Sequence, residues 1–249
     1  KMKKMETDVK KLAELIRESD NIVFFGGAGV STESGVPDFR SQDGIYNQKY
    51  KYPPEMIISH SFFVKDPEEF YRFYRDRMVY PEARPNEAHR VLARLEELGK
   101  LRAVITQNID GLHQAAGSRN VLELHGSILR NHCMHCGKSF DLDHIMASDG
   151  VPRCDSCGGM IKPDVVLYEE ALDMGVMQRA ARYISEADLF IVGGTSLIVY
   201  PAAGMIDYYR GDKLVLINRD ATRRDDAADY IIHGNIGEVL GCAFSEIQA

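Results

Sequence analysis

The sequence contains no tryptophan and no long hydrophobic run. Its longest apolar stretches, among them Ile22–Phe25 and Leu189–Val192, are as short as single strands, whereas a membrane-spanning helix needs about 20 apolar residues. Basic residues are also in deficit, because 30 Lys and Arg stand against 37 Asp and Glu, which gives a net charge of −7. A protein whose main function is to bind nucleic acid usually has more basic than acidic residues. We therefore expect no membrane span and no nucleic-acid partner, and a basic partner surface is favoured.

Cysteine is scarce, and the first residues lack the features of an export signal. Residues 1–11 are charged and lead into an amphipathic pattern that includes Leu12 and Ile16, so we expect no signal peptide. Four of the five cysteines form two Cys-x-x-Cys pairs, which favours a metal in a reducing compartment over disulfides. We place the protein in the cytoplasm and expect it to be a monomer.

Short apolar runs alternate with amphipathic stretches along most of the 249 residues. The clearest helix has Asn86 as its N-cap, continues to Leu98 and is closed by Gly99. Strands that alternate with helices of this length pair in parallel through right-handed crossovers. We therefore predict an α/β fold with a Rossmann-like doubly wound parallel sheet. The expected strands are Ile22–Phe25, Ala103–Thr106, Val121–Leu124, Val165–Tyr168, Leu189–Val192 and Leu214–Ile217.

Two segments interrupt this alternation. One is rich in Tyr, Phe, Arg and Pro and has a helical pattern, and the other carries the cysteine pairs. Because neither fits a repeat of strand and helix, we predict that both are insertions at the binding edge of the sheet. The sheet is then built from residues 1–40, 85–130 and 163–249, and the insertions are a helical one, residues 41–84, and a four-cysteine module, residues 131–162.

The cysteine pairs have the spacing of a zinc ribbon. Cys133 and Cys136 form the first pair, Cys154 and Cys157 form the second, and 17 residues separate the pairs. Four thiolates on two tight turns complete a tetrahedron around Zn²⁺ and leave no open position, so we expect one structural zinc ion. Four unliganded thiols are the weaker alternative. Acidic residues outnumber basic ones in this module, which argues against a face that binds phosphates.

A glycine-rich turn follows the first expected strand. Gly27, Ala28 and Gly29 stand where a Rossmann-like fold brings a strand end and a helix N-terminus against a pyrophosphate. A tight turn without a ligand is the alternative. The dehydrogenase pattern requires a third glycine where Thr32 stands, and the next glycine is Gly35. Hydride transfer is therefore disfavoured.

Several motifs follow one another along the chain: Gly27-Ala28-Gly29-Val30-Ser31, Gly35-Val36-Pro37-Asp38-Phe39-Arg40, Thr106-Gln107-Asn108-Ile109-Asp110, Leu124-His125-Gly126 and the two Cys-x-x-Cys pairs. With these motifs in this order, the sequence resembles the sirtuins, which are NAD-dependent protein lysine deacylases, from about Asp20 to Val239. The resemblance implies a large Rossmann-like domain, a smaller domain formed by the helical insertion and the zinc module, and a cleft between them that binds NAD as co-substrate and acyl-lysine. It also implies removal of acetyl from N6-acetyl-lysine, with release of nicotinamide and O-acetyl-ADP-ribose.

The same resemblance assigns catalytic roles. His125 would be the base that removes the proton of the ribose 2′-hydroxyl, because imidazole has a pKa near the working pH. Asn108 would orient the ribose hydroxyls or a water molecule, Gln107 would contact the ribose, and Asp110 would accept a hydrogen bond from the nicotinamide amide. Without the family, His125 would be a capping or core residue and Asp110 the cap of the next helix.

Further residues are assigned to the cofactor and to the substrate. Phe39 would cover C1′ after nicotinamide leaves, Arg40 would hold a phosphate, and Asp38 would shape the loop. Acyl-lysine would enter between segments 163–170 and 196–200 and add as a strand. The cofactor set is Gly27, Ala28, Gly29, Thr32, Asp38, Phe39, Arg40, Gln107, Asn108, Asp110, Gly194, Thr195, Ser196 and Asn218, and the substrate set is Val165, Val166, Tyr168 and Val199, most of which are also good core residues.

Two departures from the family pattern leave the substrate open. Glu169 stands where the family usually has glycine, and its carboxylate would face the incoming peptide and favour a basic one. Members that remove acidic acyl groups carry Tyr-x-x-Arg in the helical insertion. The pattern is matched in residue types by Tyr74-Arg75-Asp76-Arg77. The expected distance from Pro85-Asn86 is met better by Tyr71-x-x-Tyr74, which lacks the arginine. Acetyl is therefore favoured over acidic or longer acyl groups.

Three other functions compete with deacetylation. A protein ADP-ribosyltransferase would use the same site and pass the ribosyl group to a protein. A nicotinamide dehydrogenase is disfavoured by the broken glycine pattern, and a zinc-ribbon adaptor without activity would not depend on His125.

Overall fold

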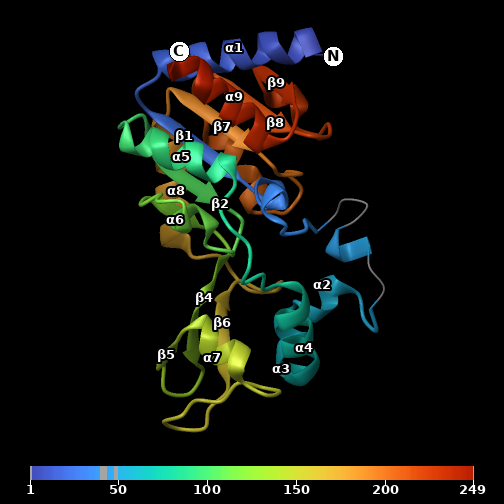
Figure 1. Ribbon diagram of the computed structural model, residues 1–249. Coiled ribbons are helices and arrows are strands. Elements are labelled where there is room, and N and C mark those ends of the chain that lie inside the picture. The colour runs from blue at the N-terminus through green and yellow to red at the C-terminus, as the bar shows by residue number, and fades with distance from the viewer. Residues whose placement is uncertain (1, 40–43, 48–49, 249) are drawn as a thin grey trace.

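The computed structural model describes residues 2–39, 44–47 and 50–248, which form a large and a small part along one long axis (Figure 1). Both ends of the chain lie at the far end of the large part. None of the helices found among the described residues is long and apolar enough to cross a membrane.

A six-stranded parallel sheet forms the centre of the large part. Its strand order is β3-β2-β1-β7-β8-β9, which is the doubly wound order and confirms the predicted fold class. The runs β1 and β7 are buried at every residue, as expected for central strands covered on both faces. The strands are β1 Ile22–Gly26, β2 Leu101–Thr106, β3 Val121–Glu123, β7 Leu189–Gly193, β8 Leu214–Asn218 and β9 Tyr230–His233.

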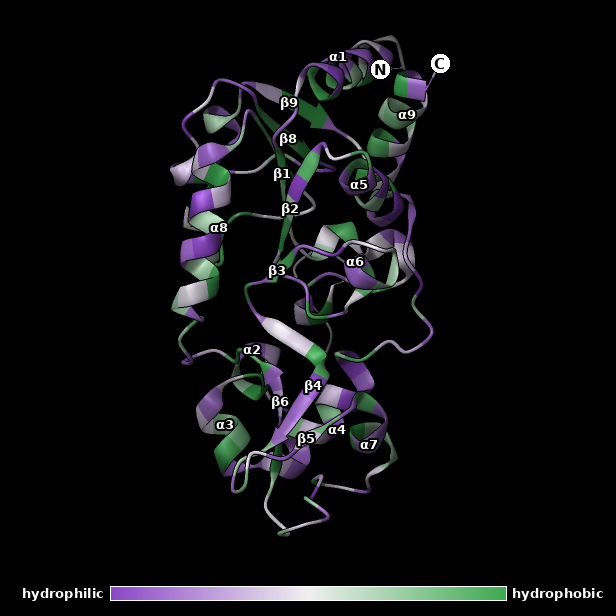
Figure 2. Cartoon of the chain, turned by 90° about the vertical axis from the view of Figure 1, so that its left-hand side faces the viewer, coloured by the Kyte–Doolittle hydropathy of each residue, from purple (hydrophilic) through white to green (hydrophobic). Residues whose placement is uncertain are grey.

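Helices cover both faces of this sheet (Figure 2). On one face, α1 (Met2–Glu18), α5 (Glu87–Glu97) and α9 (Ile236–Gln248) bury a continuous apolar core that includes Leu12, Leu92 and Leu240. On the other face, α8 (Met174–Glu186) and the 3₁₀ helix η4 (Ala202–Tyr208) pack on the sheet. The predicted helix from Asn86 is confirmed, because the Asn86 side chain accepts a hydrogen bond from Ala88 N.

The small part combines a three-stranded antiparallel sheet with short helices (Figure 1). Large side chains from the helices, among them Phe63, Phe70 and Tyr71, share one core with Ile145 and Ile161 beside the sheet. The two insertions therefore pack against each other. The elements are α2 Pro54–Ile57, α3 His60–Lys65, α4 Pro67–Arg77, β4 Gly126–Cys133, β5 Ser139–Phe140, α7 Leu142–Ala147 and β6 Ile161–Val165.

The expectation of a parallel-sheet strand at Val165–Tyr168 is wrong. Strand β6 ends at Val165 and pairs antiparallel with β4, with Gly126 opposite Val165. Its side chains alternate between buried and half-buried, because only one face of this small sheet packs on a core. The predicted domain boundaries at 130/131 and 162/163 fall inside β4 and β6, and the division into two domains stays a prediction.

Candidate active site

A cavity of about 530 Å³ opens at the carboxyl ends of the parallel strands, between the large sheet and the small part. The strand order reverses between the parallel neighbours β1 and β7, because β2 and β3 lie on one side of this pair and β8 and β9 on the other. Such a switch point is where doubly wound sheets bind their ligands. Gly27 does not line the cavity, and Arg40 lies outside the described residues. The other predicted cofactor and substrate residues all line it: Ala28, Gly29, Thr32, Asp38, Phe39, Gln107, Asn108, Asp110, His125, Val165, Val166, Tyr168, Gly194, Thr195, Ser196, Val199 and Asn218.

The glycine-rich turn lets two strand ends touch. Gly29 N donates to Gly194 O over 2.8 Å, and a Cβ added to Gly29 would lie 2.8 Å from Gly194 Cα. A Cβ on Gly27 would lie 2.8 Å from Gln107 Oε1, so this glycine makes room for a neighbouring site residue. The predicted helix N-terminus is wrong here, because two 3₁₀ turns, Ala28–Val30 and Thr32–Ser34, follow β1.

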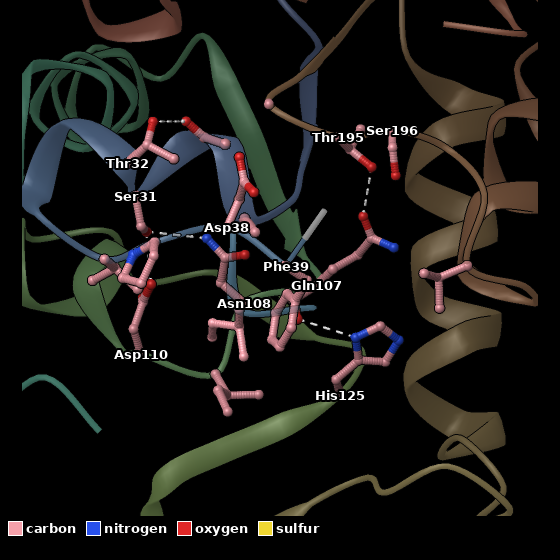
Figure 3. Close-up of a pocket in the computed structure, with 18 of the residues that line it drawn as sticks. Ser31, Thr32, Asp38, Phe39, Gln107, Asn108, Asp110, His125, Thr195 and Ser196 are labelled. Carbon is pink, nitrogen blue, oxygen red and sulfur yellow. Dashed lines mark hydrogen bonds between the residues drawn. The ribbon is translucent and has the colours of Figure 1, made fainter. Parts of the chain in front are cut away.

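His125 lies where the chain crosses from β3 to β4. Its Nδ1 is 3.0 Å from the backbone oxygen of Gln107 (Figure 3). Because a carbonyl oxygen only accepts, Nδ1 carries the proton, and Nε2 is left as the basic nitrogen. Burial lowers the pKa of His125, and the hydrogen bond from Nδ1 opposes part of this effect. The imidazole is therefore an uncharged base at neutral pH.

A hydroxyl links two of the predicted catalytic side chains. Ser31 Oγ donates to Asp110 Oδ2 over 2.6 Å and accepts from Asn108 Nδ2 over 3.1 Å. Asp110 Oδ1 also accepts from Leu112 N over 2.9 Å, so the capping role and a role in the cavity coexist. Burial raises the pKa of Asp110, and these hydrogen bonds oppose the effect. Sequence reasoning did not assign Ser31 to the site, although the residue stands in the glycine-rich motif.

Three strand ends are tied together on the other side of His125. Gln107 Oε1 accepts from Thr195 Oγ1 over 2.8 Å (Figure 3). Thr195 N donates to Asn218 Oδ1 over 3.0 Å. Asn218 Nδ2 is buried and has no hydrogen-bond partner among the residues that the structure describes. A buried donor without a partner is costly, and it fits a ligand oxygen such as a ribose hydroxyl. Asn218 Nδ2 is thus available to donate a hydrogen bond to a ligand in the cavity.

Two histidines are buried behind this site. The rings of His89 and His113 are 4.8 Å apart, and neither nitrogen of His113 has a hydrogen-bond partner among the described residues. His89 Nδ1 accepts from Asn86 N, and Nε2 is 3.5 Å from Ser31 Oγ. Burial lowers the pKa of His89 to about 4 and that of His113 to about 3.

These two histidines are expected to make stability depend on acid. The unfolded chain binds their protons near pH 6.5, whereas the folded chain binds them only near pH 4 and 3. The free energy of unfolding therefore falls as pH decreases below about 6.5, over the full range by on the order of 3 kcal/mol for His89 and 5 kcal/mol for His113. Urea unfolding at pH 7.5 and at pH 5 gives the decrease in the free energy of unfolding between the two pH values. This decrease should be smaller in His113→Leu than in the original chain. In the exposed His233→Gln it should equal that of the original chain. An equal loss in His113→Leu and the original chain would contradict the assignment.

The predicted substrate residues meet at the lower wall of the cavity. Val165 is the last residue of β6, Val166 and Tyr168 follow it, and Val199 comes from the loop after β7. The carboxylate of Glu169 accepts from Ser61 N over 2.8 Å and from Ser61 Oγ over 2.9 Å. The carboxylate is therefore bound to α3, while Glu169 also lines the cavity, and its contact with an incoming peptide stays a prediction.

The aromatic and basic side chains of α4 serve mainly the small core. Tyr71 and Tyr74 are fully buried there, and neither lines the cavity. Arg75 donates to Ile145 O and Gly150 O. Of the two residues that match Tyr-x-x-Arg, Tyr74 and Arg77, only Arg77 lines the cavity. The carboxylate-binding pair is thus not assembled by these residues, which supports the preference for acetyl.

The four cysteines form a separate centre at the far end of the small part. All four Sγ atoms lie within 4.8 Å of one another. The Sγ atoms of Cys133 and Cys157 are 3.5 Å apart, and those of Cys136 and Cys154 are 3.7 Å apart. Tetrahedral Zn²⁺ with bonds of about 2.3 Å needs sulfur atoms about 3.8 Å apart, so the cluster fits one structural zinc ion.

The sheet order and the cavity at its switch point define a Rossmann-like nucleotide-binding protein. The family model of the Sir2 family matches residues 27–201, and the chain belongs to this family.

Similar proteins agree over nearly the whole chain. An NAD-dependent protein deacetylase of Clostridium acetobutylicum is 58% identical over 235 residues, which cover 93% of this chain and 96% of that protein. One of Clostridium perfringens is 58% identical over 240 residues, which cover 95% and 98%. A solved Sir2 homolog in complex with NAD has a TM-score of 0.85 at 41% identity, covering 96% and 93%. A Sir2 structure with deacetylated p53 peptide and 3′-O-acetyl ADP-ribose has a TM-score of 0.87 at 40% identity, covering 96% and 98%.

Proposed function

We infer that the protein is an NAD-dependent protein lysine deacetylase. It removes acetyl from N6-acetyl-lysine and releases nicotinamide and O-acetyl-ADP-ribose. The observation that carries this conclusion is His125, an imidazole in the cavity wall whose proton is fixed on Nδ1 by Gln107 O and whose charge is suppressed by burial. The family and the deacetylases that share most of their length with this chain support it.

The roles of the individual residues are part of the proposal. Bound NAD supplies a ribose carbon from which nicotinamide leaves and to which the acetyl oxygen adds. His125 Nε2 takes the proton of the ribose 2′-hydroxyl as general base. Asn108 and Asp110, held by Ser31, position the ribose hydroxyls and the nicotinamide amide. Phe39 excludes water from the reacting carbon.

The remaining binding contacts follow the shape of the cavity. Thr195, Ser196 and Asn218 would hold the adenosine half of NAD, with Asn218 Nδ2 as an available donor. Val166, Tyr168 and Val199 would line the path of the acyl-lysine side chain. The substrate is then an acetylated protein. A monomer that binds no nucleic acid and is located in the cytoplasm remains our prediction.

Mass balance tests this function directly. The protein is incubated with NAD and an acetyl-lysine peptide, and the products are identified by mass spectrometry. We expect deacetylated peptide, nicotinamide and O-acetyl-ADP-ribose in equal amounts. If the protein gains the mass of ADP-ribose while the acetyl peptide persists, it is an ADP-ribosyltransferase instead. If only peptides with succinyl or longer acyl groups are deacylated, the acyl group of the substrate is corrected.

A further inference from the structure

Two tyrosine hydroxyls meet at the wall of the cavity. Tyr46 and Tyr168 both line it, and their hydroxyl oxygens are 2.9 Å apart, within hydrogen-bond distance. Tyr46 belongs to the 3₁₀ turn Ile45–Asn47, and Tyr168 follows strand β6. The contact therefore joins two segments of the cavity wall that are 122 positions apart in the sequence.

Tyr46 is tied to the residue that would cover the reacting carbon. Its backbone N donates to Phe39 O over 2.8 Å, and Ile45 N donates to Asp38 O over 2.9 Å. The rings of Phe39 and Tyr46 are 5.4 Å apart in a tilted arrangement. Because both backbone and ring contacts connect them, a shift of Tyr46 displaces Phe39 as well.

Tyr168 is fixed from the other side. Its backbone N donates to Ile58 O over 3.0 Å, and its backbone oxygen accepts from His60 N over 3.0 Å. The neighbouring Glu169 binds Ser61 through its carboxylate. These contacts fix the backbone of Tyr168 to α3 and to the turn before α3. The hydrogen bond with the Tyr168 hydroxyl can therefore fix the position of Tyr46.

We propose that Tyr46 and Tyr168 are positioning residues whose hydroxyl hydrogen bond holds Phe39 over the reacting ribose carbon beside the acyl-lysine path. The proposal rests on the proposed function. With the bond in place, the acyl oxygen reaches this carbon and water does not. Without it, water takes the place of the acyl oxygen, and NAD and water give ADP-ribose, nicotinamide and a proton while the peptide keeps its acetyl group.

Single hydroxyls can be removed without loss of the rings. We expect Tyr46→Phe and Tyr168→Phe each to raise the KM for NAD about threefold to tenfold, the range that one neutral hydrogen bond gives. The ratio of nicotinamide to deacetylated peptide should rise from 1 by a similar factor, and the thermal midpoint should fall by no more than about 2 to 4 °C. The double variant should be no worse than either single one, because both remove the same bond. Tyr230→Phe, on β9 and outside the cavity, is the control and should match the original chain.

Several outcomes would overturn the proposal. A ratio of 1 and an unchanged KM in both single variants would show that the bond positions nothing. Additive effects in the double variant would show two separate roles. The original chain is measured in the same assay, so an original chain that cleaves NAD without deacetylating the peptide would reject the proposed function instead. If the proposed function fails, calorimetric titration with NAD alone still measures the affinity of each variant for NAD. Equal affinities in the variants and the original chain would then reject the positioning role of the Tyr46–Tyr168 bond.

Discussion

His125→Ala is expected to lower the rate of deacetylation by about 100-fold to 10,000-fold, the usual contribution of a positioned general base. The substitution removes the nitrogen that takes the ribose proton, while the contacts that hold the remaining cavity residues stay in place. Among these are the bonds of Ser31 to Asn108 and Asp110, and that of Thr195 to Gln107. The affinity for NAD should therefore change by only a few-fold. Loss of rate with retained binding is the signature of a catalytic group.

The pH dependence of the original chain provides a second measurement of the same residue. Burial lowers the pKa of His125 from its ordinary value of 6.5, so the base stays uncharged to a lower pH than an exposed histidine does. The deacetylation rate at low peptide concentration should be level above pH 6.5 and fall only on the acid side of it. His233→Ala, on the exposed edge of β9, should keep the full rate. A His125→Ala variant that retains more than a tenth of the rate would show that another group acts as base.

Central strands and the metal centre could be predicted from the sequence because their patterns are local. Ile22–Phe25 and Leu189–Val192 are short apolar runs, and such runs are typical of strands buried on both faces. The cysteine spacing specifies two tight turns, and the structure brings the four sulfur atoms together. The strand ends also predicted that His125 and Asn108 meet in one crevice, since carboxyl ends of parallel strands share an edge.

Other features depend on neighbours that are distant in the sequence. Strand β9 has a mixed burial pattern because it is the sheet edge, so no clean apolar run marks it. The apolar residues of segment 165–168 predict a strand of the large sheet, but Val165 ends β6 and pairs with β4, and Tyr168 forms a bridge with Ser59. The direction of the Glu169 carboxylate is set by Ser61, which lies 108 positions away. Neither composition nor periodicity contains such information.

Removal of the metal is expected to abolish activity although the centre lies at the far end of the small part. Cys133 and Cys154 are buried in the same core as Ile161 and the helices of the small part. Structural zinc contributes about 10 to 16 kcal/mol to folding in small metal domains, as much as the whole stability of many domains. Without it, strand β6 loses its support, and Val166 N no longer holds the backbone oxygen of His125 at 2.9 Å. The small part should unfold while the six-stranded sheet persists.

Cys154→Ser and Cys242→Ser separate this effect from a general sensitivity to cysteine loss. Cys242 lies on α9, outside the four-sulfur cluster, so its variant should keep one zinc ion per chain and the full rate. Cys154→Ser should lose zinc, deacetylation and part of the cooperative thermal transition, and a strong chelator should reproduce this in the original chain. Zinc content, near-ultraviolet circular dichroism and activity are measured on the same samples. Full activity in a zinc-free sample would contradict the structural role, because β4 connects the metal ligand Cys133 to Gly126, the residue that follows His125.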